Sequence, residues 1–451
     1  MSVNIREIVF DSLLECEERG AKSHLLIRDV LSKYDYLDER DKNFIKRLFE
    51  GTIQLRITLD HFLDKFSKTP MAKCKPAVRT ILRMGAYQIV YMDRVPDSAA
   101  CDEAVKLCKK RSRQEFAGFV NAVLKKLAAD KARITDFDDI EDPVMRMSVK
   151  YSIPAPITAM LYKEVIGKDT ERADIFFKAL TSERNTVVRI TSGDVENDIV
   201  KKWRDAGIKY VKSAVIDRAY EISGYGSVEE IPGFTEGFVY IQDLSSMIAV
   251  SEAVKALKTP PGGKDDMCNI LDLCAAPGGK SIYALELLGK NAHVIACDVS
   301  DNKAALIEEN IKRLNISDME CKVCDATIPN EDFIGRFDLV IADVPCSGLG
   351  VISKKSDIKY KITNEVMKDI CDLQKRIADN AVRYVKPGGV LMYSTCTVHR
   401  AENEKMASYI LKNSGFTLVS SKQLFPDTDG TDGFYYAVFV KDKDITGDKE
   451  D

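Results

Sequence analysis

The chain has 451 residues, which is too long for one ordinary domain. Hydrophobic residues make up 45% and charged residues 30%, a composition typical of a soluble globular protein. The formal net charge of -4 gives no overall basic character, so any attraction to nucleic acid must come from local clusters of charge. The start has no secretory signal pattern and no apolar run could span a bilayer, so we expect a cytoplasmic protein whose 12 cysteines are reduced thiols.

Residues 1–140 show helical patterns only. Val9 and Leu13 fall on one face of a first helix, residues 79–91 form an apolar helix, and residues 116–127 repeat apolar side chains at helical spacing. No segment in this region alternates like a strand. The sequence therefore predicts an all-α first domain.

Residues 141–240 have a different texture, because β-rich runs appear among the helical patterns. Val187–Ile190 and Ile208–Val211 have the composition of strands, and a helical segment, 196–206, lies between them. This mixture predicts a small α+β module of the ferredoxin or RRM type.

Residues 241–442 alternate between short strands and helices. The predicted strands are Ile270–Leu273, His293–Cys297, Glu320–Cys324, Phe337–Ala342 and Gly389–Tyr393. Such alternation predicts a doubly wound, Rossmann-like α/β domain with a mainly parallel sheet. Tyr435–Val440 is expected to form a late edge strand, and the charged residues 443–451 a disordered tail.

The strongest ligand signal is the run Leu271–Ser281, in which a buried strand ends in a loop of small residues and a helix follows at once. Small residues let the backbone approach a ligand, and the helix N-terminus supplies N–H donors. Asp298 ends the next strand and Asp325 follows the one after, as expected for acids that bind a ribose diol and an adenine edge. The loop has neither the dinucleotide nor the P-loop pattern, so S-adenosylmethionine fits best; a tight turn without a ligand is the alternative.

Two cysteines follow two strands that we expect to be neighbours, Cys346 after Phe337–Ala342 and Cys396 after the strand ending at Tyr393. Both should face the cofactor, because ligands bind beyond the carboxyl ends of parallel strands. A thiolate that adds to carbon 6 of a cytosine makes carbon 5 able to attack a methyl group. Asp343, near ring nitrogen 3, would stabilise the developing charge.

The remaining cysteines are interpreted as small buried apolar residues. Cys321 and Cys324 have the spacing of zinc ligands, but a structural zinc site needs four ligands and no second pair stands nearby. The four histidines do not cluster in the sequence. No metal site is predicted.

Taken together, the segments CAAPGGK, DVPCSG and STC resemble the motifs of RNA cytosine-5 methyltransferases. The resemblance implies a class I methyltransferase domain that uses S-adenosylmethionine, with Cys396 as nucleophile and Cys346 assisting product release. It implies that the cofactor is lined by Cys274, Ala275, Ala276, Pro277, Gly278, Gly279, Lys280, Asp298, Asp325 and Asp343.

The helical first domain resembles NusB-like domains, best at Arg83–Val90 and Gly118–Leu124. This architecture is similar to the Sun/Fmu (RsmB) branch of the family, which implies 16S ribosomal RNA as substrate, free or in early subunit assembly. It implies no metal or membrane partner, and a monomer is expected. A transfer-RNA cytosine-5 methyltransferase and a non-catalytic RNA-binding or antitermination factor remain alternatives.

Three basic clusters are candidate contacts for RNA phosphates. The cluster nearest the catalytic cysteines comprises Lys354, Lys355, Lys359 and Lys361. The two in the first domain comprise Lys65, Lys68, Lys73, Lys75, Arg79 and Arg83, and Lys106, Lys109, Lys110, Arg111 and Arg113. Solvated helix faces are the alternative reading for the latter two.

Overall fold

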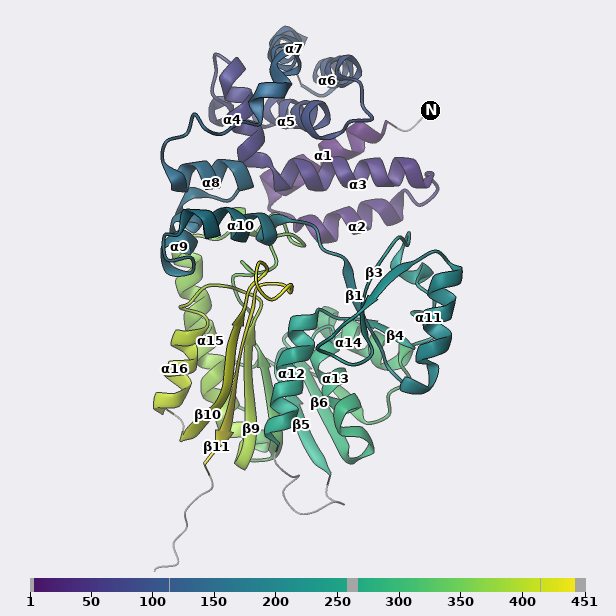
Figure 1. Cartoon of the computed structure of the whole chain (residues 1–451), viewed down its shortest axis with the longest axis vertical. Helices are drawn as coiled ribbons and strands as arrows, with labels where there is room; N and C mark the ends of the chain where they lie inside the picture. The colour runs from purple at the N-terminus through teal and green to yellow at the C-terminus, as the bar shows by residue number, and fades with distance from the viewer. Residues whose placement is uncertain (1–3, 113, 258–266, 414, 443–451) are drawn as a thin grey trace, which may run out of the picture. The chain divides into compact units, whose positions relative to one another are not determined.

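The computed structural model describes residues 4–112, 114–257, 267–413 and 415–442, so the predicted tail at 443–451 lies outside the described residues (Figure 1). The chain divides into two compact units. One comprises Met1–Ser182 with Ile352–Lys361, and the other Glu183–Val351 with Ile362–Asp451. Within the described part of the chain, no helix is long and apolar enough to cross a membrane.

The first unit is all helical, as predicted, but its helices continue well beyond residue 140. Its helices are α1 (Ile5–Arg19), α2 (Ser23–Lys33), α3 (Glu39–Gln54), α4 (Arg56–Phe66), α5 (Pro76–Tyr91), α6 (Asp97–Arg111), α7 (Ala117–Ile134), α8 (Pro143–Tyr151), α9 (Ala155–Glu164) and α10 (Thr170–Thr181), with the 3-10 turns η1 (Met71–Lys73) and η2 (Gln114–Phe116). Asn4 and Asp38 cap α1 and α3 by accepting backbone N–H groups. The predicted apolar faces, Val9 and Leu13 among them, form one buried core.

A ten-residue segment from far along the chain completes this helical unit. Ile352–Lys361, with the 3-10 turn η7 (Ile358–Tyr360), belongs to it by its contacts. Lys359 is 0% exposed and donates to the Gln54 carbonyl at 2.8 Å. The interpretation of Lys359 as an RNA contact is therefore wrong, because its ammonium group is enclosed by protein.

The other basic residues of that cluster and of the two helical clusters are largely paired. Lys361 donates to the Gly20 and Ala21 carbonyls and pairs with Asp357. The ion pairs of the helical clusters are Arg79–Glu17, Arg83–Asp60, Lys65–Asp139, Lys106–Glu103, Lys110–Glu7 and Arg111–Asp11, while Arg113 lies outside the described residues. These pairings weaken the expectation that the clusters grip phosphates.

The second unit begins with a small antiparallel sheet in the order β2-β3-β1-β4. Its elements are β1 (Thr186–Ile190), the 3-10 turn η3 (Gly193–Val195), α11 (Glu196–Asp205), β2 (Lys209–Lys212), β3 (Ala219–Ser223), η4 (Val228–Glu230) and β4 (Val239–Ile241). This is the ferredoxin-like order, with the second helix reduced to η4. The strands of this module span residues 186–241, whereas the sequence predicted that the module begins at residue 141. The difference arises because three helices, α8–α10, precede the first strand and belong to the helical unit.

The large sheet has the order β10-β11-β9-β8-β5-β6-β7. Its strands are β5 (Cys268–Asp272), β6 (Ala292–Asp298), β7 (Met319–Val323), β8 (Phe337–Asp343), β9 (Val385–Thr395), β10 (Phe416–Leu424) and β11 (Phe434–Lys441). The strands from β5 to β9 run parallel, and β11 lies antiparallel between β9 and β10. The expectation that residues 435–440 form an edge strand is therefore wrong: β10 takes the edge, and its mostly exposed, polar sequence gave no strand signal.

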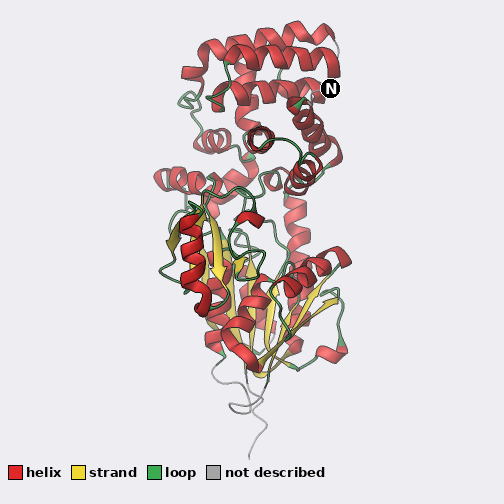
Figure 2. Cartoon of the chain, turned by 90° about the vertical axis from the view of Figure 1, so that its right-hand side faces the viewer, coloured by secondary structure: helices red, strands yellow, loops and turns green. Residues whose placement is uncertain are grey.

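Helices cover both faces of this sheet, as the alternation predicted (Figure 2). The helices are α12 (Leu244–Ala256), α13 (Gly279–Leu288), α14 (Asp301–Arg313), α15 (Asn364–Tyr384) and α16 (Glu404–Asn413), with the turns η5 (Gly289–Asn291) and η6 (Glu331–Phe333). Side chains of α12, α13 and α14 pack with one set of strand residues, and those of α15 and α16 with the alternate set. Two buried cores therefore hold the sheet rigid, and its carboxyl ends carry the site.

Candidate active site

The site lies where the strand order reverses. From β5 the chain continues to β6 and β7 on one side of β5, whereas β8 and β9 lie on the other side. A crevice forms at such a switch point, because the loops after the two central strands depart in opposite directions. The loops after β5 and β8 contain the predicted cofactor run and Cys346.

The loop after β5 is fixed by hydrogen bonds at its base. Asp272, 1% exposed, accepts from the Ser281 hydroxyl at 2.6 Å and from the Cys274 N–H at 3.3 Å. Burial raises the pKa of Asp272 to about 7. Gly278 adopts φ 102°, a left-handed conformation that suits glycine, and starts α13. The sequence reading treated Asp272 only as part of the strand and so missed it.

Asp298 holds the same loop from the neighbouring strand. Its carboxylate accepts from the Ala276 N–H at 3.0 Å, from Lys303 at 2.9 Å and from its neighbour Val299 at 2.8 Å. Asp325, after β7, accepts from the hydroxyl and N–H of Thr327, and these bonds lower its pKa. The two acids thus stand at the carboxyl ends of adjacent strands.

The two cysteines meet at the ends of β8 and β9, which are neighbours as predicted. The Sγ atoms of Cys346 and Cys396 lie 3.2 Å apart, and both residues are half-buried. The Gly350 N–H donates to the Cys396 carbonyl at 3.1 Å and joins the two loops. The hydrogen bond to Cys396, and then burial, raise the pKa of Cys346 well above its usual value. Both effects favour the protonated form of Cys346.

A half-buried cation lies near the pair. Lys280 donates to Asp343 at 2.6 Å, and the second Asp343 oxygen accepts from Ser394 at 2.7 Å. Burial lowers the pKa of Lys280, but Asp343 outweighs burial and the net shift is upward, with a further contribution from the negative form of Cys396. A fixed ammonium group within electrostatic reach of Cys396 favours its thiolate. Both oxygens of Asp343 are already engaged, so its first role is to hold Lys280.

A buried carboxylate that the sequence reading missed ties the cysteine loops together. Glu402 is 0% exposed and accepts from the Ser347 N–H at 2.8 Å and from the Gln374 side-chain amide at 3.1 Å. Its other oxygen lies 2.9 Å from Nδ1 of His399. Gln374 also donates to the Pro345 carbonyl at 3.0 Å. Ser347 and Pro345 flank Cys346, so this network sets the position of its loop.

Cys321 and Cys324, which have the spacing of zinc ligands, bond elsewhere. Cys321 contacts the Ala304 carbonyl, whereas Cys324 interacts with Cys297. Among the described residues, no group of three or more histidine, cysteine or acidic side chains is arranged to hold a metal ion.

The chain is similar in sequence to known methyltransferases. A family model described as 16S rRNA methyltransferase RsmB/F matches residues 261–440, and a NusB family model matches residues 3–129. The chain is 31% identical to the probable ribosomal RNA small subunit methyltransferase B of Bacillus subtilis strain 168, over 96% of this chain and 97% of that protein. It is 26% identical to the ribosomal RNA small subunit methyltransferase B of Klebsiella pneumoniae strain 342, over 97% and 98%.

Solved structures share the fold. The crystal structure of PH0851 covers 98% of this chain and all of its own, with TM-score 0.77 and 20% identity. NSun6 from Pyrococcus horikoshii, crystallised with SFG, covers 63% of this chain and 97% of its own, with TM-score 0.54 and 21% identity. These comparisons confirm the NusB-like helical domain and the methyltransferase fold expected from the motifs. The chain therefore belongs to the RsmB/F family of 16S rRNA methyltransferases.

Proposed function

We propose that this protein transfers a methyl group from S-adenosylmethionine to carbon 5 of a cytosine in 16S ribosomal RNA. The observation that carries the proposal is the 3.2 Å contact between Cys346 and Cys396 near the half-buried Lys280. Family membership and near full-length similarity to small-subunit rRNA methyltransferases favour the ribosomal substrate.

The residues of the switch point fit an adenosine-containing cofactor. The small residues from Ala275 to Gly279 offer a backbone surface, while Asp298 and Asp325 offer carboxylates at successive strand ends. A Cβ atom on Gly279 would approach the Tyr240 ring to 3.1 Å, so the chain is closely packed there. When bound, S-adenosylmethionine supplies the methyl group as an electrophile.

The cysteines supply the covalent chemistry. The Cys396 thiolate, opposite the Lys280 cation, adds to carbon 6 of the cytosine, and the electron pair of the 5,6 double bond makes carbon 5 nucleophilic. After methylation, a solvent water takes the carbon-5 proton, and the electron pair of that C–H bond restores the 5,6 double bond. The bond between carbon 6 and sulfur breaks, and its electron pair stays on the Cys396 sulfur as a thiolate. Cys346 keeps its proton and lies in contact with Cys396, where it can protonate the departing thiolate.

The test is transfer of radiolabelled methyl groups to unmodified 16S RNA, to unmodified transfer RNA and to 16S RNA assembled with small-subunit proteins, followed by nucleoside analysis. We expect 5-methylcytosine in 16S RNA, free or assembled. Label in transfer RNA alone would keep the chemistry and overturn the substrate. Label in none of the three would overturn the proposed activity and revive the non-catalytic RNA-binding alternative.

A further inference from the structure

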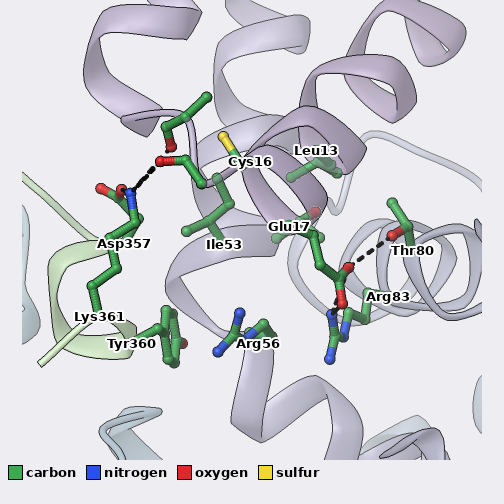
Figure 3. A pocket seen from close by; sticks show the side chains of 13 residues that line it. Leu13, Cys16, Glu17, Ile53, Arg56, Thr80, Arg83, Asp357, Tyr360 and Lys361 are labelled. Atoms are coloured by element: carbon green, nitrogen blue, oxygen red, sulfur yellow. Dashed lines mark hydrogen bonds and ion pairs between the residues drawn. The ribbon is translucent and has the colours of Figure 1, made fainter. Parts of the chain in front are cut away.

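The helical unit contains a cavity of about 220 Å³ that takes no part in the chemistry described above (Figure 3). Its walls come from α1, from the junction of α3 and α4, from α5 and from η7. Leu13, Cys16 and Ile53 form an apolar side, and the rest of the wall consists mostly of charged and polar groups. All of these elements belong to the same unit.

Almost every charged group in the wall has a partner inside the protein. Glu17 bonds to Arg79, Arg83 and the Thr80 hydroxyl. Arg83 makes two bonds of 2.7 Å to Asp60. The charges of these groups are therefore balanced inside the protein, although the buried Arg79 Nε has no hydrogen-bond partner among the described residues.

The opposite wall is also internally paired. Asp357 accepts from the Ser23 hydroxyl at 2.6 Å and pairs with Lys361 at 2.8 Å. Lys361 donates its other protons to the Gly20 and Ala21 carbonyls. Its charge is balanced by Asp357 and its donors are engaged.

Arg56 is the exception. Within the described ranges it has no ion pair and no hydrogen bond; its guanidinium carbon lies 3.8 Å from the centroid of the Tyr360 ring. Tyr360 is itself fixed, because its hydroxyl bonds to the Gln54 carbonyl and to Ser152. A guanidinium stacked on a ring keeps its N–H donors free in the plane. Burial lowers the pKa of Arg56, yet a guanidinium stays charged in proteins.

The charge count around the cavity points to a monoanion. Among the side chains that line it and their ion-pair partners, three cations face three carboxylates, leaving Arg56 as one positive charge in excess. The six balanced groups are Arg79, Arg83, Lys361, Glu17, Asp60 and Asp357. A partly buried charge without a partner is costly, and an oxyanion bound to the guanidinium fork removes that cost. A phosphodiester carries one negative charge and has the geometry of that fork.

We propose that this cavity binds a phosphodiester of the RNA substrate, with Arg56 donating two parallel hydrogen bonds to its oxygens. The cavity is larger than a phosphate group, and its apolar side at Leu13, Cys16 and Ile53 receives the attached sugar or base. The choice of RNA as the source rests on the proposed function. A free nucleotide would offer the same phosphate chemistry, and the test separates the two.

The experiment compares wild type, Arg56→Gln and Arg56→Lys with Arg28→Gln as a matched control, since Arg28 is an exposed arginine of the same unit. Binding of a labelled 16S RNA fragment is measured by fluorescence anisotropy at several salt concentrations. Binding of cytidylyl-(3′→5′)-cytidine and of cytidine monophosphate is measured by calorimetry. Thermal unfolding of each variant without ligand confirms its fold, and Arg56→Lys serves if Arg56→Gln does not fold.

We expect the dinucleotide to bind wild type and the control, and to lose at least about ten-fold in affinity on either Arg56 variant. Arg56→Gln should weaken RNA binding. In a plot of the logarithm of the binding constant against the logarithm of the salt concentration, its slope should be less steep by roughly 0.7 to 1. Equal losses in Arg28→Gln, or no dinucleotide binding to wild type, would overturn the proposal. Nucleotide binding that depends on Arg56, with RNA affinity unchanged, would overturn RNA as the source.

Methyl transfer to the same RNA is measured in parallel. If the Arg56 variants bind dinucleotide and RNA as wild type does and methyl transfer is normal, the proposed phosphodiester site is wrong and the proposed function stands. Arg56-dependent binding without transfer would contradict the proposed function and leave the cavity standing.

Discussion

The cysteine pair and the Arg56 cavity treat buried charge in opposite ways. Beside the cysteines, Lys280 is bonded to Asp343, and Glu402 is bonded to Ser347, Gln374 and His399. In the helical unit, the Arg56 guanidinium contacts a ring face and has no acceptor among the described residues. The first arrangement holds reacting groups in one geometry, whereas the second leaves a donor for a ligand. Changes at the first should alter the rate of transfer, and changes at the second the affinity for RNA.

The largest effect is expected from the cysteines. Cys396→Ala should reduce methyl transfer by roughly 10⁴-fold or more, as removal of a nucleophile does, while the dissociation constant for S-adenosylmethionine stays unchanged in calorimetry.

Cys346→Ala should instead leave protein covalently attached to RNA, seen as a shifted band on a denaturing gel. Normal turnover by Cys346→Ala would remove this residue from product release.

Glu402→Gln should reduce the turnover rate by roughly 10- to 100-fold, because the Cys346 loop loses one acceptor and gains a misplaced donor. Cofactor affinity should stay the same, which distinguishes a positioning defect from a collapsed site. Glu404→Gln, two residues along and 42% exposed at its side chain, is the matched control. A turnover rate equal to that of the control would show that the Glu402 network does not position the cysteines.

A smaller effect is expected from Asp298→Asn, since an amide offers one acceptor oxygen where the carboxylate bonds the Ala276 N–H and Lys303 on two. The dissociation constant for S-adenosylmethionine should rise about 10-fold or more, because hydrogen bonds to charged groups contribute about 1.5 to 3 kcal/mol each. The exposed Asp301→Asn is the control for calorimetry. Unchanged affinity would argue against Asp298 as a cofactor contact.

The last prediction concerns stability and sharpens the view of the helical unit. Burial lowers the pKa of Lys359 from 10.5 to about 7. Between these values the unfolded chain binds more protons than the folded one, so the lysine's contribution makes the free energy of unfolding rise with pH. Relative to Lys359→Met, wild type should gain about 1.4 kcal/mol per pH unit between pH 7.5 and 9.5 in urea unfolding. A constant difference, as for exposed Lys46→Met, would contradict this titration.

The cysteine site was largely predictable from the sequence, because each of its loops directly follows a strand of one parallel sheet. Local strand-to-loop connections place Cys346, Cys396 and Asp298 at the same end of the sheet, and the adjacency of β8 and β9 brings the two cysteines together. Glu402 was missed because its burial depends on packing of distant elements, and a glutamate near a helix start normally faces solvent. The misreading of Lys359 has the same cause, since its acceptor is 305 residues earlier in the chain.

The segment Ile352–Lys361 has a consequence for the order of folding during synthesis. The ribosome releases the helices up to residue 182 long before this segment exists, yet Tyr360 and Lys359 supply part of that unit's buried interior. The core of the helical unit therefore stays incomplete until about 170 further residues have been synthesised. Closing so long a loop carries an entropic cost that grows only slowly with its length. A nascent chain that stalls before residue 361 therefore exposes the part of the helical unit that this segment covers.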